Sequence, residues 1–165
     1  ALLITGEHEV FYKQNRIGYR NGTFGIWKFA TMLKNSPNIG TGSLTVRGDP
    51  RVTSVGRFLR ATKINELPQL INVLTGEMSF VGPRPERPEF VERLEQTIPY
   101  YRERHTVKPG ITGWAQLCYP YGASEKDARE KLQYDLYYVK NRSLIFDLAI
   151  LVQTVEVVLW GKGAR

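Results

Sequence analysis

The sequence predicts a mainly helical α+β fold of the α/β class, a compact single domain over residues 1–165 with a small N-terminal β-hairpin and interfacial amphipathic helices. Only the N-terminal region pairs aromatic and β-branched runs across a turn. Most of the chain from residue 51 onward has apolar residues at helical spacing. With 165 residues, 42% of them apolar, the chain is long enough for one core and too short to suggest two.

The hairpin strands are expected at residues 9–14 and 23–29, which are rich in aromatic and β-branched side chains. Asn21-Gly22 between them is a typical hairpin turn. Residues 34–50 are crowded with Asn, Ser, Gly, Pro and Thr and have no apolar period. We therefore expect a loop there, either a lid or a surface excursion.

A basic amphipathic helix is predicted over residues 51–62. Its apolar residues at helical spacing are Val52, Val55, Phe58 and Leu59, and its arginines are Arg51, Arg57 and Arg60. Two interpretations are open. The helix is either solvated and packed on the core, or it lies at a membrane interface with its arginines on lipid head groups.

Proline and glycine separate the elements in the middle of the chain. The predicted elements are helices over residues 66–74, 85–96 and 100–105 and a short strand over residues 112–118. Gly76 supplies a left-handed stop for the first helix, and Pro99 separates the second helix from the third. Pro109-Gly110 forms a turn before the strand.

Two helices are predicted at the C-terminal end. Ser124 opens a capping box for a helix that runs to about Asn141. Residues 144–160 are apolar nearly all round, so this helix is either deeply buried or pressed against lipid. It is marginal in length for crossing a bilayer. Lys162 and Arg165 follow it, in a position that suits either the C-terminus of a helix or anionic head groups.

The charge balance points to an anionic partner. The 23 Lys and Arg residues against 16 Asp and Glu give a net charge of +7. Cys118 is the only cysteine, and His8 and His105 have no flanking ligand pattern, so neither a disulfide nor a zinc site is implied and a reducing cytoplasm fits. The aromatic residues fall at helical or core-like spacing rather than among basic residues, so we expect no nucleic acid partner.

Asn65 and Glu66 allow two interpretations. Asn is among the best N-cap residues, and a carboxylate suits the positive end of the helix dipole, so the pair could simply begin a helix. Alternatively, the pair lies at the centre of an active site. Arg84 favours the second interpretation, because flanking prolines hold its backbone extended and suit it to bidentate phosphate capture. A stiff polyproline-type linker is the alternative for that segment.

A carboxylate beside a rigidly displayed arginine is a suitable place for Mg²⁺ and a diphosphate. Magnesium prefers oxygen ligands, and the arginine neutralises charge that the metal does not. The further candidate cations are Arg16 and Lys28 in the hairpin and Lys108 beside a glycine-rich bend.

Several motifs occur in order along nearly the whole chain. They are Asn65-Glu66-Leu67-Pro68-Gln69-Leu70, Gly76-Glu77-Met78-Ser79, Val81-Gly82-Pro83-Arg84-Pro85, Lys108-Pro109-Gly110-Ile111-Thr112-Gly113-Trp114-Ala115-Gln116 and Gly161-Lys162-Gly163-Ala164-Arg165. In this combination the chain resembles the bacterial sugar transferase family, the monotopic phosphoglycosyl transferases of exopolysaccharide and O-antigen assembly. Several motifs at consistent spacing are far more specific than any one alone.

The resemblance implies transfer of a sugar 1-phosphate from a UDP-sugar to polyprenyl (undecaprenyl) phosphate, with release of UMP and a need for Mg²⁺. It places the protein at the cytoplasmic face of the bacterial inner membrane, held there by an N-terminal anchor. This sequence opens on Ala1 and lacks such an anchor, so we expect its natural start upstream. Glu66 matches the family's metal-binding Glu, Arg84 its phosphate-binding arginine, and Lys28 a basic residue near the substrate.

Asn65 departs from the family pattern, in which an Asp at this position attacks phosphorus. A neutral amide oxygen is a poor nucleophile, so the covalent route fails as written. Four explanations are open: an engineered replacement that traps a state, attack by Glu66, direct attack by polyprenyl phosphate, or a catalytically silent basic module that binds an anionic membrane or nucleic acid. A second departure is Tyr119-Pro120-Tyr121-Gly122, where many members carry Gly-Arg-Asn. No motif identifies the sugar or the oligomeric state.

Overall fold

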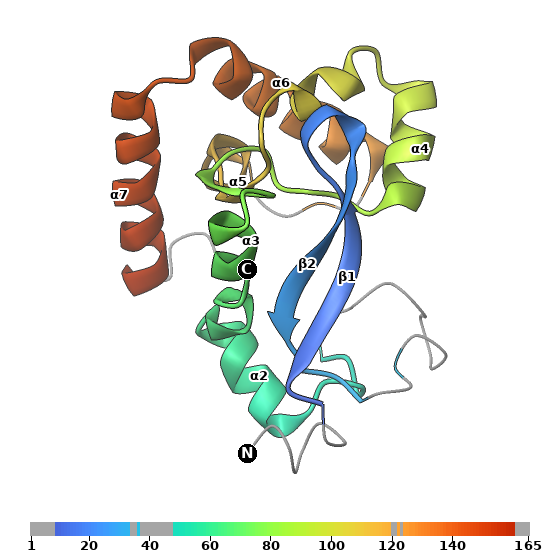
Figure 1. Cartoon of the computed structure of the whole chain (residues 1–165), viewed down its shortest axis with the longest axis vertical. Helices are drawn as coiled ribbons and strands as arrows, with labels where there is room; N and C mark the ends of the chain where they lie inside the picture. The colour runs from blue at the N-terminus through green and yellow to red at the C-terminus, as the bar shows by residue number, and fades with distance from the viewer. Residues whose placement is uncertain (1–8, 34–35, 37–47, 120–121, 123, 161–165) are drawn as a thin grey trace. The chain divides into compact units, whose positions relative to one another are not determined.

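The computed structural model describes residues 9–33, 36, 48–119, 122 and 124–160 (Figure 1). Helices dominate this part of the chain, and its strands form two separate two-stranded sheets, which confirms the mainly helical α+β prediction. His8, most of the loop predicted over residues 34–50, and the cations Lys162 and Arg165 lie outside the described residues.

The described residues form four strands, six α-helices and three 3₁₀ helices. The strands are β1 (Phe11–Ile17), β2 (Thr23–Phe29), β3 (Ser79–Val81) and β4 (Gly110–Thr112). The α-helices are α2 (Ser54–Ala61), α3 (Gln69–Leu74), α4 (Pro88–Thr97), α5 (Trp114–Cys118), α6 (Glu125–Asn141) and α7 (Leu144–Trp160). The 3₁₀ helices are η1 (Tyr19–Asn21), η3 (Ile64–Glu66) and η4 (Tyr101–Thr106).

The chain packs into two compact units, and each of them is built from two separate segments. The first unit comprises residues 1–14 and 27–70, and the second comprises residues 15–26 and 71–165. Both hairpin strands and α3 continue from one unit into the other. The single domain expected over residues 1–165 stays a prediction.

The β-hairpin confirms the predicted strands, and β1 extends three residues beyond the predicted end to Ile17. Its turn is closed by hydrogen bonds from the Gly18 amide to the Gly22 carbonyl (2.8 Å) and from the Gly22 amide to the Tyr19 carbonyl (3.0 Å). Asn21 has a φ of 61°, the left-handed conformation that Asn tolerates in turns.

Helix α2 of the first unit is shorter than predicted and begins at a capped residue. The Thr53 hydroxyl accepts a hydrogen bond of 3.0 Å from the Gly56 amide. A Cβ on Gly56 would lie 2.1 Å from the Thr31 carbonyl oxygen, so only glycine permits this close packing. Phe58 projects from the helix and is 62% exposed.

The arginines of this region are not all on the surface, so the predicted basic face is wrong in part. Arg51 precedes α2 and is buried, with its guanidinium 2.6 Å from the carboxylate of Asp49. Arg60 donates from Nε to the Thr31 hydroxyl at 2.9 Å. A buried guanidinium needs such partners to offset the loss of water, and it cannot reach a lipid head group at the same time. Arg57 remains exposed on α2.

Strands β3 and β4 form a parallel pair in the second unit, with Ser79 opposite Gly110 and Val81 opposite Thr112. The chain bends at Gly82 directly after β3. A Cβ on Gly110 would lie 2.1 Å from the Gly82 nitrogen, and one on Gly113 would lie 2.2 Å from the Gly82 oxygen. These glycines therefore allow two of the sequence motifs to pack backbone against backbone.

The strand predicted over residues 112–118 is wrong, because only Thr112 belongs to β4 and α5 follows from Trp114. Trp114 and Leu117 are three residues apart and pack against the same buried cluster. A helix places such a pair on one face, whereas a strand would place them on opposite faces. The short apolar run fits both a helix and a strand, and its packing against the core selects the helix.

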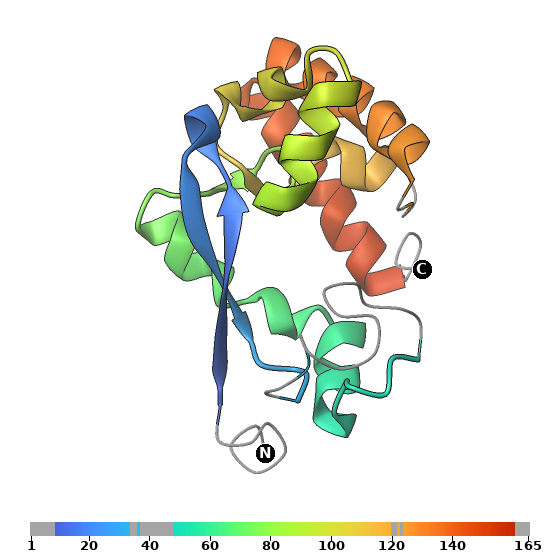
Figure 2. The ribbon, with the colours of Figure 1, turned by 90° about the vertical axis from the view of Figure 1, so that its right-hand side faces the viewer.

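Two buried clusters form the core of the second unit. The first consists of Val91, Leu94, Ile98, Tyr101 and Leu132, and the second of Val81, Val107, Tyr138 and Ile150. Figure 1 draws α4 and α7 on opposite sides of α5 and α6, and Figure 2 shows α4 in front in the turned view. The predicted capping box at Ser124 is confirmed and opens α6. The predicted breaks at Gly76, with a φ of 80°, and before Pro99 are also confirmed.

Helix α7 has one buried face and one exposed face. Ile150 is fully buried, and the Thr154 hydroxyl lies 2.7 Å from that of Thr112 in β4. The exposed apolar residues, called the α7 apolar stripe below, are Leu144, Ile145, Leu148, Val152, Val155 and Val158. Among the described residues, no helix combines the length and apolar character needed to cross a membrane.

Candidate active site

Asn65 and Glu66 lie in the 3₁₀ helix η3, which is half-buried and belongs to the first unit. Lys63 precedes them in the left-handed conformation, with a φ of 60°. Helix α3 begins only at Gln69, directly after Pro68, and no hydrogen bond of the Asn65 side chain is found within the described residues. The interpretation of Asn65 as the N-cap of a helix from residue 66 is therefore wrong.

The candidate residues are divided between the two units. Lys28 of β2, which is half-buried, shares the first unit with Asn65 and Glu66. Arg16, Arg84 and Lys108 belong to the second unit. Lys108 is exposed, and its Nζ lies 3.6 Å from the position that a Cβ on Gly76 would take. Its ammonium group is therefore next to the turn that leads into β3.

Arg84 lies on a segment whose backbone is held at every residue. The four successive carbonyl oxygens of residues 83–86, called the 83–86 segment below, each accept a hydrogen bond from a different donor. In chain order, the donors are the Gly110 amide (3.0 Å), the Arg104 guanidinium (2.9 Å), the Arg16 guanidinium (3.2 Å) and the Ile17 amide (2.9 Å). Pro83 and Pro85 themselves are buried.

The helix predicted from Pro85 begins only at Pro88, and these contacts explain the difference. Carbonyl oxygens at the start of a helix accept bonds from amides four residues later, but those of the 83–86 segment are taken by other segments. Arg87, which precedes Pro88, is extended with a φ of −72° and a ψ of 148°. The extended backbone predicted around Arg84 thus continues to Arg87.

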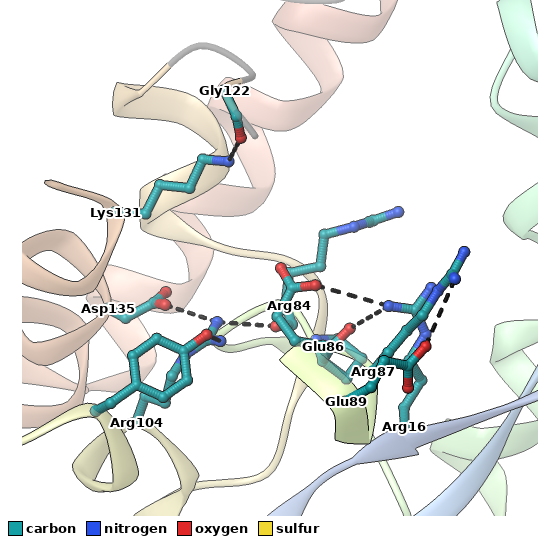
Figure 3. A network of polar contacts seen from close by, with 11 residues as sticks. Arg16, Arg84, Glu86, Arg87, Glu89, Arg104, Gly122, Lys131 and Asp135 are labelled. Atoms are coloured by element: carbon teal, nitrogen blue, oxygen red, sulfur yellow. Dashed lines mark hydrogen bonds and ion pairs between the residues drawn. The ribbon is translucent and has the colours of Figure 1, made fainter. Parts of the chain in front are cut away.

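Arg84 and Arg87 are close enough to Arg16 to influence its guanidinium group. Burial lowers the pKa of Arg16, Glu86 opposes this effect, and the positive charges of Arg84 and Arg87 lower it further. Figure 3 shows the Arg84 side chain extending from the 83–86 segment on the side where Arg16 and Arg87 end. Glu86 and Glu89 offset part of this positive charge, at 3.7 Å from Arg16 and Arg87 respectively, and the charge that remains favours a further anion.

Arg16 has contacts that differ from those of a displayed cation. Its guanidinium donates to the Pro85 carbonyl at 3.2 Å and lies 3.7 Å from the carboxylate of Glu86, with the side chain 14% exposed. Arg16 therefore supports the backbone beside Arg84. Its direct contact with substrate stays a prediction.

Sequence reasoning missed a buried network behind Arg84. The Arg104 guanidinium lies 2.8 Å from the carboxylate of Asp135 and donates to the Tyr101 hydroxyl at 2.9 Å. Burial alone would lower the pKa of Arg104, but the negative charge of Asp135 outweighs this effect and raises it. A signal existed in the sequence, because Asp135 lies three residues from both Leu132 and Tyr138 on the buried face of α6.

The magnesium site expected at Glu66 stays a prediction. Within the described residues, no group of three or more His, Cys, Asp and Glu side chains could hold a metal by itself. Mg²⁺ is commonly bound by one or two carboxylates together with substrate phosphates. Glu66 is the single carboxylate that the sequence predicts for this role.

Comparison with known proteins identifies the family of the chain. A family model described as "Bacterial sugar transferase" matches residues 1–161. The chain belongs to the bacterial sugar transferase family. Family membership explains why the motifs around Glu66, Arg84 and Lys108 occur together.

Curated members of the bacterial sugar transferase family match nearly the whole chain. The UDP-N-acetylgalactosamine-undecaprenyl-phosphate N-acetylgalactosaminephosphotransferase of Aeromonas hydrophila is 47% identical, over 94% of this chain and 37% of its own length. The UDP-glucose:undecaprenyl-phosphate glucose-1-phosphate transferase of Escherichia coli (strain K12) is 43% identical, over 94% of this chain and 34% of its own length. The exopolysaccharide production protein PSS of Rhizobium leguminosarum bv. phaseoli is 39% identical, over 93% of this chain and 80% of its own length.

The chain spans about a third of the length of the first two relatives, 37% and 34%. Their names carry different sugars, N-acetylgalactosamine and glucose. Similarity at this level therefore identifies the family without identifying the sugar.

Proposed function

We propose that the chain is the catalytic domain of a phosphoglycosyl transferase, which transfers a sugar 1-phosphate from a UDP-sugar to undecaprenyl phosphate and releases UMP. Membership of the bacterial sugar transferase family and the names of its curated relatives support this reaction. The observation that carries it is Arg84, which is displayed on a fixed backbone beside Arg16 and Arg87. A diphosphate is the kind of anion that such a cluster recognises.

The reaction exchanges one phosphoanhydride for another. The bond between the two phosphates of the UDP-sugar breaks, UMP leaves with the bridging oxygen, and an acceptor oxygen bonds to the phosphorus that carries the sugar. Negative charge develops on the leaving phosphate, and a fixed arginine stabilises it without reorganising. We assign that role to Arg84, with Lys28 and Lys108 as further cations for the substrate.

Glu66 is the proposed carboxylate for Mg²⁺, which when bound would neutralise phosphate charge. Asn65, at the position of the family's nucleophile, leaves three routes for the natural chain: attack by Glu66, direct attack by undecaprenyl phosphate, or a catalytically silent domain. An engineered replacement of Asp is the fourth explanation. The amide side chain of Asn65, a poor nucleophile, favours the alternative function, a catalytically silent basic module that binds an anionic membrane.

The proposed site of action is the cytoplasmic face of the bacterial inner membrane. The α7 apolar stripe of the second unit supplies apolar surface for the interface, and the net charge of +7 suits anionic lipid. Arg51 is excluded from this contact because it is buried against Asp49.

The test is release of UMP by the membrane-reconstituted protein with undecaprenyl phosphate and Mg²⁺ across a panel of UDP-sugars. We expect release with at least one sugar and its loss in Arg84→Ala. The preferred UDP-sugar with Mg²⁺ should also raise the melting temperature, as ligand linkage requires. A silent membrane-binding module would show neither effect.

A further inference from the structure

We propose that Arg104 is a positioning residue for Arg84, and that Asp135 and Tyr101 hold Arg104 in place for this purpose. The inference rests on the proposed role of Arg84 in binding the diphosphate. It assigns a function to a buried ion pair that would otherwise serve only the core. The contacts of the Arg104 guanidinium carry the argument.

The Arg104 guanidinium has three partners on three different elements. It donates from Nη2 to the Arg84 carbonyl (2.9 Å), lies 2.8 Å from the Asp135 carboxylate of α6, and donates from Nη1 to the Tyr101 hydroxyl (2.9 Å). Figure 3 shows the guanidinium between Asp135 on one side and the backbone of Arg84 on the other. One planar group thus joins helix α6 to the backbone from which Arg84 extends.

The network is too deeply buried to be an ordinary surface salt bridge. The side chains of Arg104 and Asp135 are 6% and 5% exposed. Apolar side chains of similar volume commonly replace such a pair without loss of stability, so stability alone does not require it. A hydrogen bond to the Arg84 carbonyl is what an apolar replacement could not supply.

The carbonyl of Arg84 also has no alternative donor within its own segment. Prolines at 83 and 85 lack amide hydrogens, and the neighbouring carbonyls are bound by Gly110, Arg16 and Ile17. Without Arg104, the peptide between Arg84 and Pro85 would lose the hydrogen bond to its carbonyl oxygen. The direction of the Arg84 side chain depends on that peptide.

The double variant Arg104→Met/Asp135→Leu tests the inference, because it removes both charges together and leaves no unpaired ion in the core. The readouts are amide hydrogen exchange of residues 82–90 and affinity for UDP with Mg²⁺. We expect exchange in residues 82–90 to accelerate and UDP affinity to fall about tenfold or more, since small displacements of positioned groups have effects of this size.

Arg104→Lys is the second variant and keeps the positive charge beside Asp135. A compact ammonium group cannot contact Asp135, Tyr101 and the Arg84 carbonyl together, so we expect the same direction of change. The matched control is Arg102→Met/Glu95→Leu, which removes the neighbouring ion pair of 2.8 Å in which Arg102 is 70% exposed and Glu95 15% exposed. This control should leave both readouts within about twofold of the original, because within the described residues neither side chain contacts the 83–86 segment and a pair with one exposed partner contributes little.

Arg84→Ala separates the positioning inference from the proposed function. If Arg84→Ala leaves UDP affinity unchanged, the phosphate role of Arg84 fails, while hydrogen exchange still reports whether Arg104 fixes the segment. If Arg84→Ala weakens binding but both Arg104 variants bind UDP as the original protein does, the positioning role is overturned. Unchanged exchange in both Arg104 variants overturns it as well.

Discussion

The Tyr138 hydroxyl of α6 donates a hydrogen bond of 2.8 Å to the carboxylate of Asp147 in α7, and it lies 3.3 Å from the Val81 carbonyl. The contact joins the last two helices at the edge of the second core cluster, where burial raises the pKa of Tyr138. It therefore ties α7 to the helix before it through a buried donor and a charged acceptor.

Tyr138→Phe should lower the free energy of unfolding by roughly 1–3 kcal/mol, because a hydrogen bond to a charged group is lost and the carboxylate is left with fewer partners. Urea denaturation measures the change. Tyr137→Phe is the matched control, since its side chain is 53% exposed and should change stability little. Equal effects of the two variants would show that the Tyr138 hydroxyl does not stabilise α7.

Stability should fall as the pH is lowered from about 6.5 to about 3, because of His105. Burial, aided by Arg104 and Arg102, lowers the pKa of this histidine from 6.5 to about 3 in the folded state. Between these values the unfolded chain binds a proton that the folded chain does not, so acid favours unfolding. The contribution is on the order of a few kcal/mol at the acid end.

His105→Asn isolates this contribution from that of the carboxylates. An Asn amide can donate to Asn21 as the histidine Nδ1 does, and it does not titrate. The difference in unfolding free energy between the two proteins should therefore change with pH between about 3 and 6.5. A constant difference over this range would contradict the low pKa.

Asn65→Asp should create or strengthen turnover, because it supplies a charged oxygen at the nucleophile's position. A phosphosugar adduct should then appear as a mass increase when undecaprenyl phosphate is withheld. The side chain of Asn65 makes no hydrogen bond within the described residues, so the fold should tolerate the change. If the Asn65 form already turns over and Asn65→Asp gives neither an adduct nor a faster rate, the covalent route does not apply.

Glu66→Gln should abolish the Mg²⁺-dependent part of UDP-sugar binding, since an amide is a poor ligand for this metal. The measurement is calorimetric titration with UDP-sugar in the presence and absence of Mg²⁺. Glu77→Gln, in the turn that follows α3, is the control and should retain the dependence on metal. Unaltered affinity of Glu66→Gln with metal present would remove Glu66 from the site.

The protein should bind anionic lipid vesicles through the α7 apolar stripe, and binding should weaken with salt because of the net charge of +7. Val152→Asp, at a position that is 69% exposed, should reduce the amount that pellets with vesicles. Gln153→Asp adds the same charge at the next, also exposed, position and should have a smaller effect. Equal pelleting of Val152→Asp and the original protein would exclude the stripe from the interface.

Elements whose signals are local were predicted well from the sequence. The hairpin, the capping box at Ser124 and the stops at Gly76 and Pro99 depend on residues within a few positions, and all are confirmed. The sequence predicts a strand where the helix Trp114–Cys118 forms, because a short apolar run fits both a helix and a strand. Packing on the second cluster selects the helix.

Features that depend on distant partners could not be predicted. The sequence indicated a rigid Arg84 from its flanking prolines, but it could not show that Arg104 and Asp135, 31 positions apart, meet behind it. Arg51 was expected on the surface because basic residues usually are, and its burial depends on how Asp49 is oriented. Family resemblance supplied roles for Glu66 and Arg84 that pattern alone left open.

The 83–86 segment also constrains the length of the chain at this point. Four neighbouring carbonyls are matched one to one with donors on β4, η4 and β1. Inserting or deleting a single residue would shift every later carbonyl to the wrong donor, and both prolines would move out of register. Homologous chains that use Arg84 in the same way should therefore tolerate changes of side chain here far better than changes in residue number.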